Sequence, residues 1–243
     1  MKNFISRRIA PQEYNINQKT TLGLSLWLLL AVNFTLNYLS HTYYAEEILE
    51  ITSPGFWLFW LNSIFLFAIV TFTKRAIPWS WKDLGLGRPS SWWKPVLTSV
   101  LTFGALVLFS VFVRPVIIET FGAHQNISYL ETLKGNLPRL IQMLITVWVG
   151  AAFLEELVFR AYIIKSMEIL LGNSFLTTTF SILVSAVFFA GIHAYQGLTG
   201  LLITGSLGII FGIVYVLNGR RIWPLIFVHG LVDTIMLIGI YNS

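Results

Sequence analysis

The sequence predicts an all-α fold, a polytopic transmembrane helical bundle of about seven spans. Hydrophobic residues make up 56% of the 243-residue chain and charged residues only 11%, whereas soluble domains carry about 25% charged residues. The mean hydropathy is +0.73. Seven apolar segments have the length that crosses a bilayer. They cover roughly residues 20–40, 55–73, 95–113, 138–164, 176–195, 198–217 and 222–241.

The first span follows a polar arm, "MKNFISRRIAPQEYNINQK", at residues 1–19. The apolar run after the arm is too long for a signal peptide, and no small-residue cleavage site follows it. We therefore interpret it as an uncleaved first span. The chain divides into this arm, three accessory spans with their loops at 20–134, and a core of four spans at 135–243.

The charges of the loops predict the orientation in the membrane, because cytoplasmic loops are enriched in Lys and Arg. The arm, the second loop and the sixth loop are basic, with Lys2, Arg7, Arg8, Lys19, Lys74, Arg75, Lys82, Arg88, Lys94, Arg220 and Arg221. The first loop is acidic, with Glu46, Glu47 and Glu50. We expect a cytoplasmic N-terminus, an external C-terminus and, as location, the plasma membrane of a bacterium.

Composition also excludes several classes of function. Cysteine is absent, which rules out a thiol nucleophile, thiolate metal ligands and disulfides. The net charge of +5 is spread over short loops, as membrane topology alone would place it. We therefore expect the lipid bilayer as a partner and no nucleic acid.

The last four spans differ from the first three in their polar residues. The first three contain only Asn, Ser and Thr, which neighbouring helices can satisfy. The last four carry Glu155, Glu156, Arg160, His193, His229 and Asp233. Four ionisable groups together cost on the order of 10 kcal/mol to insert, so they must pair or line a wet cavity. Ionisable residues inside a membrane indicate a functional site by default.

Their spacing predicts how they meet. Glu156 and Arg160 are i, i+4 neighbours and can pair, as can His229 and Asp233. Glu155 points about 100° away from Glu156 on a regular helix. The fourth and fifth spans turn near Asn173, with Glu155 18 residues before it and His193 20 residues after it. An antiparallel hairpin therefore brings Glu155 and His193 to the same level.

Structural roles account for other polar residues. The Glu156–Arg160 pair fits a purely structural ion pair, and either His alone fits an interhelical hydrogen bond. The stretch "GSLGIIFG" is typical of small-residue helix packing. We interpret His41 and His124 as loop residues, and Lys165 and Glu168 as a solvated hairpin tip, all without a role.

Three short motifs resemble a known family. "EELVFR" fits EExxxR, "FAGIH" fits FxxxH and "HGLVD" fits HxxxN/D, in the order and rough spacing of the CPBP intramembrane proteases. That superfamily includes the type II CAAX prenyl endopeptidases and bacteriocin-processing or immunity proteins. The resemblance covers about residues 138–241, and it implies an endopeptidase that cleaves a membrane-associated or lipidated protein or peptide.

The resemblance also implies a role for each motif residue. Glu155 corresponds to the catalytic glutamate and His193 to its partner at the water. His229 and Asp233 correspond to the group that holds the oxyanion, while Glu156 and Arg160 are structural. The chemistry agrees, because a glutamate in a low-dielectric cavity is a stronger base and can activate water, and an imidazole can donate to a developing oxyanion.

Asp233 departs from the CAAX branch, which has Asn at this place. An ionised Asp cannot donate a hydrogen bond and would repel an oxyanion. It is therefore protonated, or it orients and charges His229, or it binds a metal.

Two further points stay open, namely whether the site binds a metal and whether His193 and His229 lie at the same depth in the membrane. Glu155, His193, His229 and Asp233 could instead bind a divalent metal such as zinc; we favour a mechanism without a cofactor. Straight helices would place the imidazoles of His193 and His229 about 10 Å apart along the membrane normal. Tilt, or a "AYQGLTG" connection that dips into the bundle, must bring them together if they share a site.

Other functions use the same residues differently. A non-enzymatic immunity or scaffold protein would retain them as a buried polar network. A proton-coupled transporter would use them as a relay, although broken helices in two corresponding halves are missing from the sequence.

Overall fold

The computed structural model describes residues 13–44, 50–122 and 128–243, and every regular element in these ranges is helical. Seven helices are long and apolar enough to cross a membrane, which confirms the predicted fold class and makes this a multi-pass membrane protein. These spans are Ile16–Tyr43, Pro54–Ala76, Trp93–Phe121, Leu137–Leu171, Phe175–Ile192, Ala194–Leu217 and Trp223–Tyr241.

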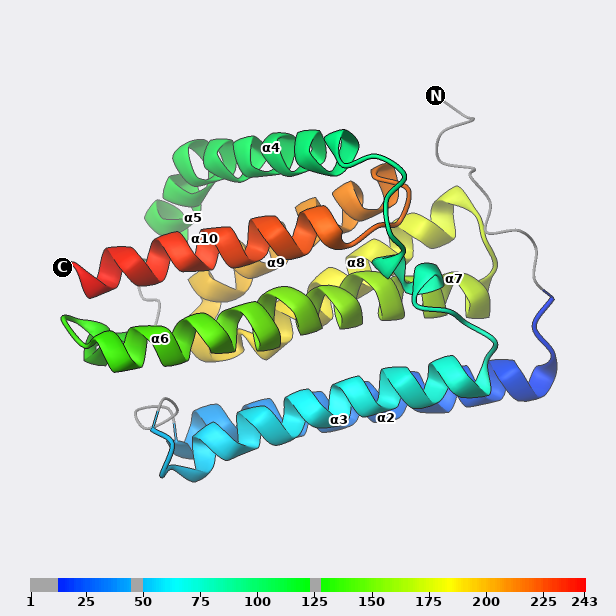
Figure 1. Ribbon diagram of the computed structural model, residues 1–243, viewed down its shortest axis with the longest axis horizontal. Coiled ribbons are helices and arrows are strands. Elements are labelled where there is room, and N and C mark those ends of the chain that lie inside the picture. The colour runs from blue at the N-terminus through cyan, green and yellow to red at the C-terminus, as the bar shows by residue number, and fades with distance from the viewer. Residues whose placement is uncertain (1–12, 45–49, 123–127) are drawn as a thin grey trace.

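Several spans consist of more than one helix (Figure 1). The first two are α2 (Ile16–Tyr44) and α3 (Pro54–Ala76). The third joins α4 (Trp93–Leu108) to α5 (Arg114–Phe121) through a π-helical turn at Phe109–Val113. The fourth contains α6 (Leu137–Thr146), a π-helical segment at Val147–Ile164 and α7 (Lys165–Leu171). The last three are α8 (Phe175–Ile192), α9 (Gly197–Leu217) and α10 (Trp223–Tyr241). Shorter turns lie at Lys82–Leu86, Ser128–Leu133 and Ala194–Gln196.

The helix starts follow from capping residues in the sequence. Ser53 caps α3 by accepting a hydrogen bond from the Gly55 amide, and Pro54 occupies the first position of the helix. Ser174 caps α8 in the same way, accepting from the Thr177 amide. A side-chain oxygen at this position satisfies one of the free amides of the first turn. These caps set where the spans begin.

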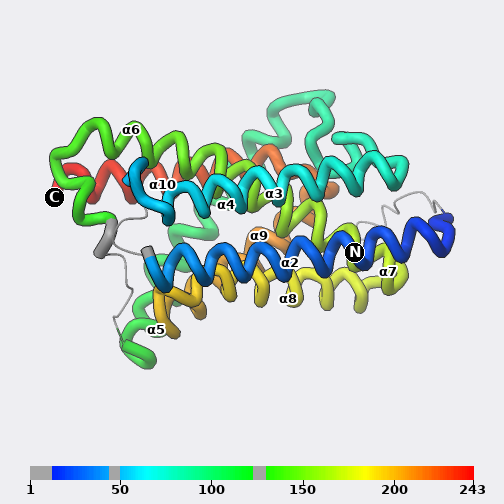
Figure 2. Tube along the Cα trace, turned by 90° about the horizontal axis from the view of Figure 1, so that it is seen from below, coloured from blue at the N-terminus to red at the C-terminus, as the bar shows by residue number. Residues whose placement is uncertain are grey.

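The helices run roughly parallel to one long axis (Figures 1 and 2). At one end, which we call the hairpin end, lie the α3–α4 connection, the α7–α8 hairpin and the α9–α10 turn. At the other, the C-terminal end, lie the end of α2, the start of α6, the α8–α9 connection and the C-terminus. Figure 1 shows the hairpin end at right and the C-terminal end at left.

The fourth span is the centre of the core. It contacts α3, α8 and α10, and nearly every side chain from Leu157 to Ile164 is fully buried. Its middle is π-helical rather than α-helical. The π-helix is rare in proteins, and where it occurs it is often at a functional site. The adjacent α8 and α9 pack closely, since a Cβ atom on Gly208 would lie 3.1 Å from Ala186. The fourth span therefore holds Glu155, Glu156 and Arg160 at the centre of the bundle.

The structure corrects two expectations. His41 is not a loop residue, because the first span continues past residue 40 and places it in the last turn of α2. Lys165 and Glu168 are not a solvated tip, since they are only 4% and 1% exposed. The α3–α4 connection and the α9–α10 turn cover them. Six residues to which the sequence analysis refers lie outside the described residues: Lys2, Arg7, Arg8, Glu46, Glu47 and His124.

Candidate active site

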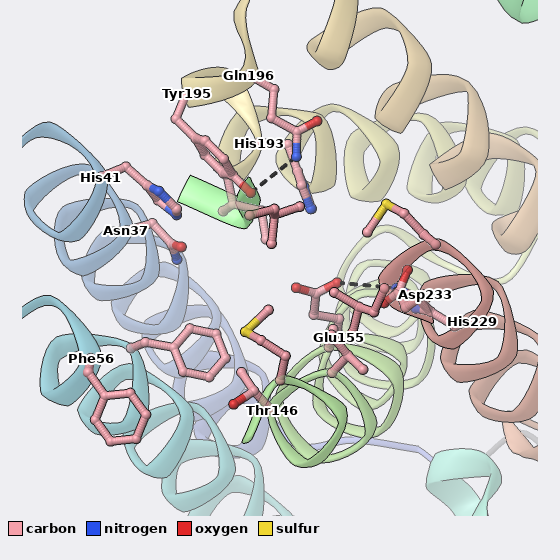
Figure 3. A pocket seen from close by; sticks show the side chains of 18 of the residues that line it. Asn37, His41, Phe56, Thr146, Glu155, His193, Tyr195, Gln196, His229 and Asp233 are labelled. Atoms are coloured by element: carbon pink, nitrogen blue, oxygen red, sulfur yellow. Dashed lines mark hydrogen bonds and ion pairs between the residues drawn. The ribbon is translucent and has the colours of Figure 1, made fainter. Parts of the chain in front are cut away.

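A cavity of about 210 Å³ lies in the half of the bundle nearer the C-terminal end (Figure 3). Glu155, His193, His229 and Asp233 all line it. They come from the fourth span, the end of α8 and the middle of α10. Three segments that are distant in the sequence thus bring four ionisable side chains to one cavity.

Glu156 lies beside this cavity and is fully buried. Its Oε1 is 3.1 Å from Nη1 of Arg160 and 2.9 Å from Nδ1 of His229. The Arg160 guanidinium also lies 4.3 Å from the ring centre of Phe189 and 5.2 Å from that of Phe211. Such cation–π contacts stabilise a desolvated cation. Glu156 therefore neutralises Arg160 and also holds the imidazole of His229.

Glu155 is the less constrained of the two adjacent glutamates. Its side chain is 17% exposed, and Figure 3 shows the carboxylate pointing into the cavity. Its Oε2 has no hydrogen-bond partner among the described residues and is 3.9 Å from Nε2 of His229. A buried carboxylate oxygen without a protein partner requires a proton or a water. Glu155 is therefore free to act on a molecule in the cavity.

His229 has a fixed ring orientation. Its ring stacks on Phe211 with centroids 5.7 Å apart. The next residue, Gly230, lets α10 approach the fourth span closely, since a Cβ atom there would lie 2.7 Å from the Trp148 ring. Because Nδ1 faces the Glu156 carboxylate, that nitrogen donates the hydrogen. The other nitrogen, Nε2, lies 3.6 Å from Oδ2 of Asp233.

His193 occupies the C-cap position of α8. Its Nδ1 is 2.8 Å from the carbonyl oxygen of Phe189, and a carbonyl only accepts, so Nδ1 bears the hydrogen. In the neutral ring Nε2 is then the acceptor. The Phe189 ring contacts both His193 and His229, with centroid distances of 4.8 and 6.4 Å. The two imidazoles therefore share one site, despite the offset in depth expected for straight helices.

The sequence did not indicate that α2 contributes to this cavity. His41 stacks on Tyr195 with ring centroids 3.5 Å apart and planes within 5°. Tyr195 in turn stacks on His193 at 6.2 Å, so three rings form a row from α2 to the site. Asn37, one turn before His41, also lines the cavity. The sequence signal for this contribution is weak: Asn37 fits a contact between helices, and His41 falls beyond the predicted end of the first span.

Glu155, His193, His229 and Asp233 carry the oxygen and nitrogen atoms that could bind a divalent metal. Within the described ranges, no group of three or more His, Asp or Glu side chains is placed to hold a metal ion. Nδ1 of His193 is engaged by the Phe189 carbonyl and Nδ1 of His229 by the Glu156 carboxylate, which leaves Nε2 of each ring facing the cavity contents. We therefore derive no chemical step through a metal.

The comparisons with known proteins agree with the motifs. Residues 136–235 match the family described as type II CAAX prenyl endopeptidase Rce1-like. This range contains Glu155, His193, His229 and Asp233, and the match confirms the resemblance to the CPBP superfamily. Neither the curated proteins nor the solved structures gave a match.

Proposed function

We propose that this chain, a member of the CPBP superfamily through residues 136–235, is an intramembrane endopeptidase. It would cleave a peptide bond of a membrane-associated or lipidated protein or peptide, using a water activated by Glu155. The family match supports a CAAX-protease-like membrane protein in general. The hydrolytic activity and the roles of the individual residues are the proposal.

One observation supports it above the others, the different environments of two adjacent glutamates. Glu156 is fully buried and occupied by Arg160 and His229. Oε2 of each glutamate has no hydrogen-bond partner in the described part of the chain, but only Glu155 lines the cavity, with a side chain that is 17% exposed. A general base must be able to reach the proton that it removes. Of the two glutamates, only Glu155 meets this condition.

The reaction follows from the positions of these groups. Glu155 removes a proton from water while Nε2 of His193 accepts the other hydrogen of that water as a hydrogen bond. The hydroxide attacks the carbonyl carbon of the scissile peptide bond. His229, held by Glu156, donates from Nε2 to the developing oxyanion. The proton on Glu155 then passes to the departing amine, which leaves both products neutralised and restores the base.

Asp233 has a consistent place in this scheme. Its Oδ2 is 3.6 Å from Nε2 of His229, too far for a strong hydrogen bond but close enough for charge attraction. A carboxylate there favours the protonated imidazole, which is the form that donates from Nε2. Of the three roles that the sequence leaves open for Asp233, we therefore propose that it orients and charges His229.

The test is hydrolysis by the purified protein in lipid nanodiscs. Quenched fluorescent peptides, with and without a prenylated cysteine, are incubated with the wild type, with Glu155→Gln and with Glu119→Gln. Glu119 is an exposed glutamate of α5 and serves as the matched control. We expect cleavage by the wild type and by Glu119→Gln, and none by Glu155→Gln.

A chelator arm is run in parallel. Cleavage that is lost on chelation and restored by one specific divalent ion would falsify the metal-free mechanism. Cleavage that persists in Glu155→Gln would show that another group is the base. The absence of cleavage for every peptide would favour the scaffold or transporter alternatives.

A further inference from the structure

The residues that line the cavity lie toward one end of the bundle. The walls of the cavity come from the last turns of α2, with Asn37 and His41, and from the first turns of α3, with Phe56. They also include Gln142, in the middle of α6, and Gln196, in the α8–α9 connection. All of these segments lie at the C-terminal end (Figure 1).

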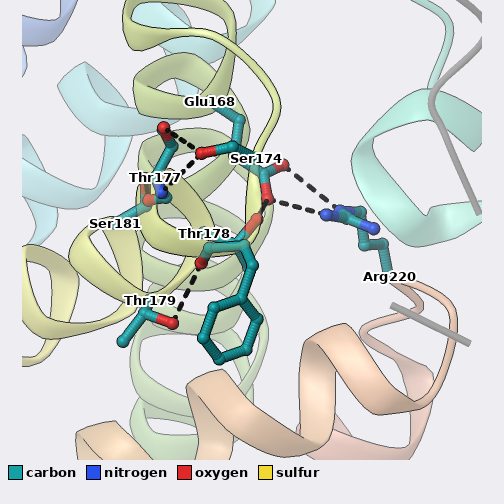
Figure 4. A network of polar contacts seen from close by, with 8 residues as sticks. Glu168, Ser174, Thr177, Thr178, Thr179, Ser181 and Arg220 are labelled. Atoms are coloured by element: carbon teal, nitrogen blue, oxygen red, sulfur yellow. Dashed lines mark hydrogen bonds and ion pairs between the residues drawn. The ribbon is translucent and has the colours of Figure 1, made fainter. Parts of the chain in front are cut away.

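The opposite end of the bundle is closed beneath the cavity. Arg160 lies between the rings of Phe189 and Phe211, directly after the cavity residues along the fourth span. Further along, Glu168 accepts hydrogen bonds from Arg220 at 2.6 Å and from Thr178 at 2.6 Å (Figure 4). Fully buried side chains occupy the levels between these two sets of contacts. A peptide therefore cannot reach Glu155 from the hairpin end.

The two ends also differ in charge. In the described residues the hairpin end is rich in cations: Lys19, Lys74, Arg75, Lys82, Arg88, Lys94, Arg220 and Arg221. Near the C-terminal end the cations are Arg114, Lys134 and Arg139, and Arg139 is paired with Glu50 at 2.9 Å. Because cytoplasmic loops hold the excess of Lys and Arg, the hairpin end belongs in the cytoplasm.

From these observations we infer that the site takes its substrate from the non-cytoplasmic face of the membrane. The substrate is an extended peptide segment on that side, such as the membrane-proximal part of a secreted or lipid-anchored protein. The inference rests on the proposed function and adds its topology. It distinguishes this chain from a protease that trims the cytosolic tail of its substrate.

The lining of the cavity defines the chemistry of that segment. Apolar side chains form much of the wall: Phe56, Phe59, Leu130, Met143, Ile192 and Met236. The polar side chains of Asn37 and His41 face Glu155 across the cavity, and Nδ1 of His41 is buried without a hydrogen-bond partner in the described structure. Such an arrangement suits apolar substrate side chains and leaves Nδ1 of His41 for a hydrogen bond to the peptide main chain, whereas the Asn37 amide nitrogen already donates to Asn33.

Cysteine labelling tests the topology independently of catalysis, because the chain has no native cysteine. Gln196→Cys reports on the cavity wall, Ala194→Cys is a second exposed position in the same connection, and Ser90→Cys reports on the hairpin end. Whole cells that produce each variant are treated with a membrane-impermeant maleimide before and after permeabilisation. We expect the first two variants to react in intact cells and Ser90→Cys only after permeabilisation.

A second arm uses sealed membrane vesicles of both orientations with a quenched apolar peptide added outside. We expect cleavage by right-side-out vesicles and a loss of cleavage in inverted ones. Labelling of Ser90→Cys in intact cells, with the cavity positions protected, would overturn the inference whatever the activity. External labelling of Gln196→Cys without cleavage in either vesicle would retain the topology and refute the proposed function.

Discussion

The fourth span contributes glutamates to two buried groups of charged residues, and the hydrogen bonding of these glutamates differs. In the hairpin-end cluster, formed by Lys165, Glu168 and Arg220, both carboxylate oxygens of Glu168 accept hydrogen bonds from Arg220. Lys165 Nζ donates to the carbonyl of Asp83 at 3.0 Å. In the cavity, Oε2 of Glu155 has no such partner among the described residues.

The difference shows how burial serves stability in one place and chemistry in the other. A buried carboxylate with all its hydrogen bonds made is held in its charged form and does not react readily. A buried carboxylate with an unused oxygen is a stronger base, and its cost must be met by the packing around it. Single substitutions in each of the two groups test this comparison.

Glu155→Gln should have the largest effect on activity. Because it removes the base and retains the shape, we expect peptide hydrolysis to fall by about 10²–10⁴-fold, with the midpoint of thermal unfolding unchanged. The measurement is initial rate together with thermal unfolding in nanodiscs, with Glu119→Gln as control. Unfolding of Glu155→Gln, together with full stability of Glu156→Gln, would reverse the roles assigned to the two glutamates.

Arg160→Leu should have the largest effect on stability. It leaves the fully buried Glu156 without its cation, and removal of one partner of a buried ion pair costs about 3–5 kcal/mol. We expect a lower free energy of unfolding in a reversible denaturation series, whereas the exposed Arg114→Leu should unfold like the wild type. Equal stability of the two variants would contradict the role of the pair.

Glu168→Gln should affect stability without affecting the chemistry of the folded protein. It weakens hydrogen bonds to a charged partner, which contribute about 1.5–3 kcal/mol each. Rates corrected for the folded fraction should equal those of the wild type. A reduced corrected rate would show that the hairpin-end cluster also controls the cavity, and the contrast between the two clusters would fail.

Asp233→Asn should have the smallest effect. Asn retains the size of the side chain and lacks the charge that favours a protonated His229, so we expect about a tenfold loss in kcat, within the range of one acid–base contact. Asp233→Ala, which also removes the hydrogen-bonding atoms, should lose more. Rescue of Asp233→Asn by an added divalent ion would identify Asp233 as a metal ligand instead.

Sequence reasoning predicted the spans and the level of Glu155 and His193, because both depend on counting residues along helices. It missed the contact between His229 and Glu156, which depends on the close approach of α10 at Gly230. The π-helical form of the fourth span has no known signal in a single sequence. Such features arise from packing between distant segments.

The two corrections have the same origin. Lys165 and Glu168 look like a polar hairpin tip when only their neighbours in sequence are considered. They are buried because Asp83 and Arg220, each more than 50 residues away, supply partners. His41 was assigned to a loop because the apolar run fades before the helix ends.

The row of rings from His41 through Tyr195 to His193 has a consequence for how such proteins diversify. The family match begins at residue 136, after α2 and α3, yet these two helices supply Asn37, His41, Phe56 and Phe59 to the cavity. The proposed reacting groups and the opposite wall of the cavity therefore come from separate parts of the chain. Under the proposed function, mutation of the first two spans would change which peptide is accepted while the proposed reacting residues remain intact, and a fragment that retains only residues 135–243 would lack the cavity wall that α2 and α3 supply.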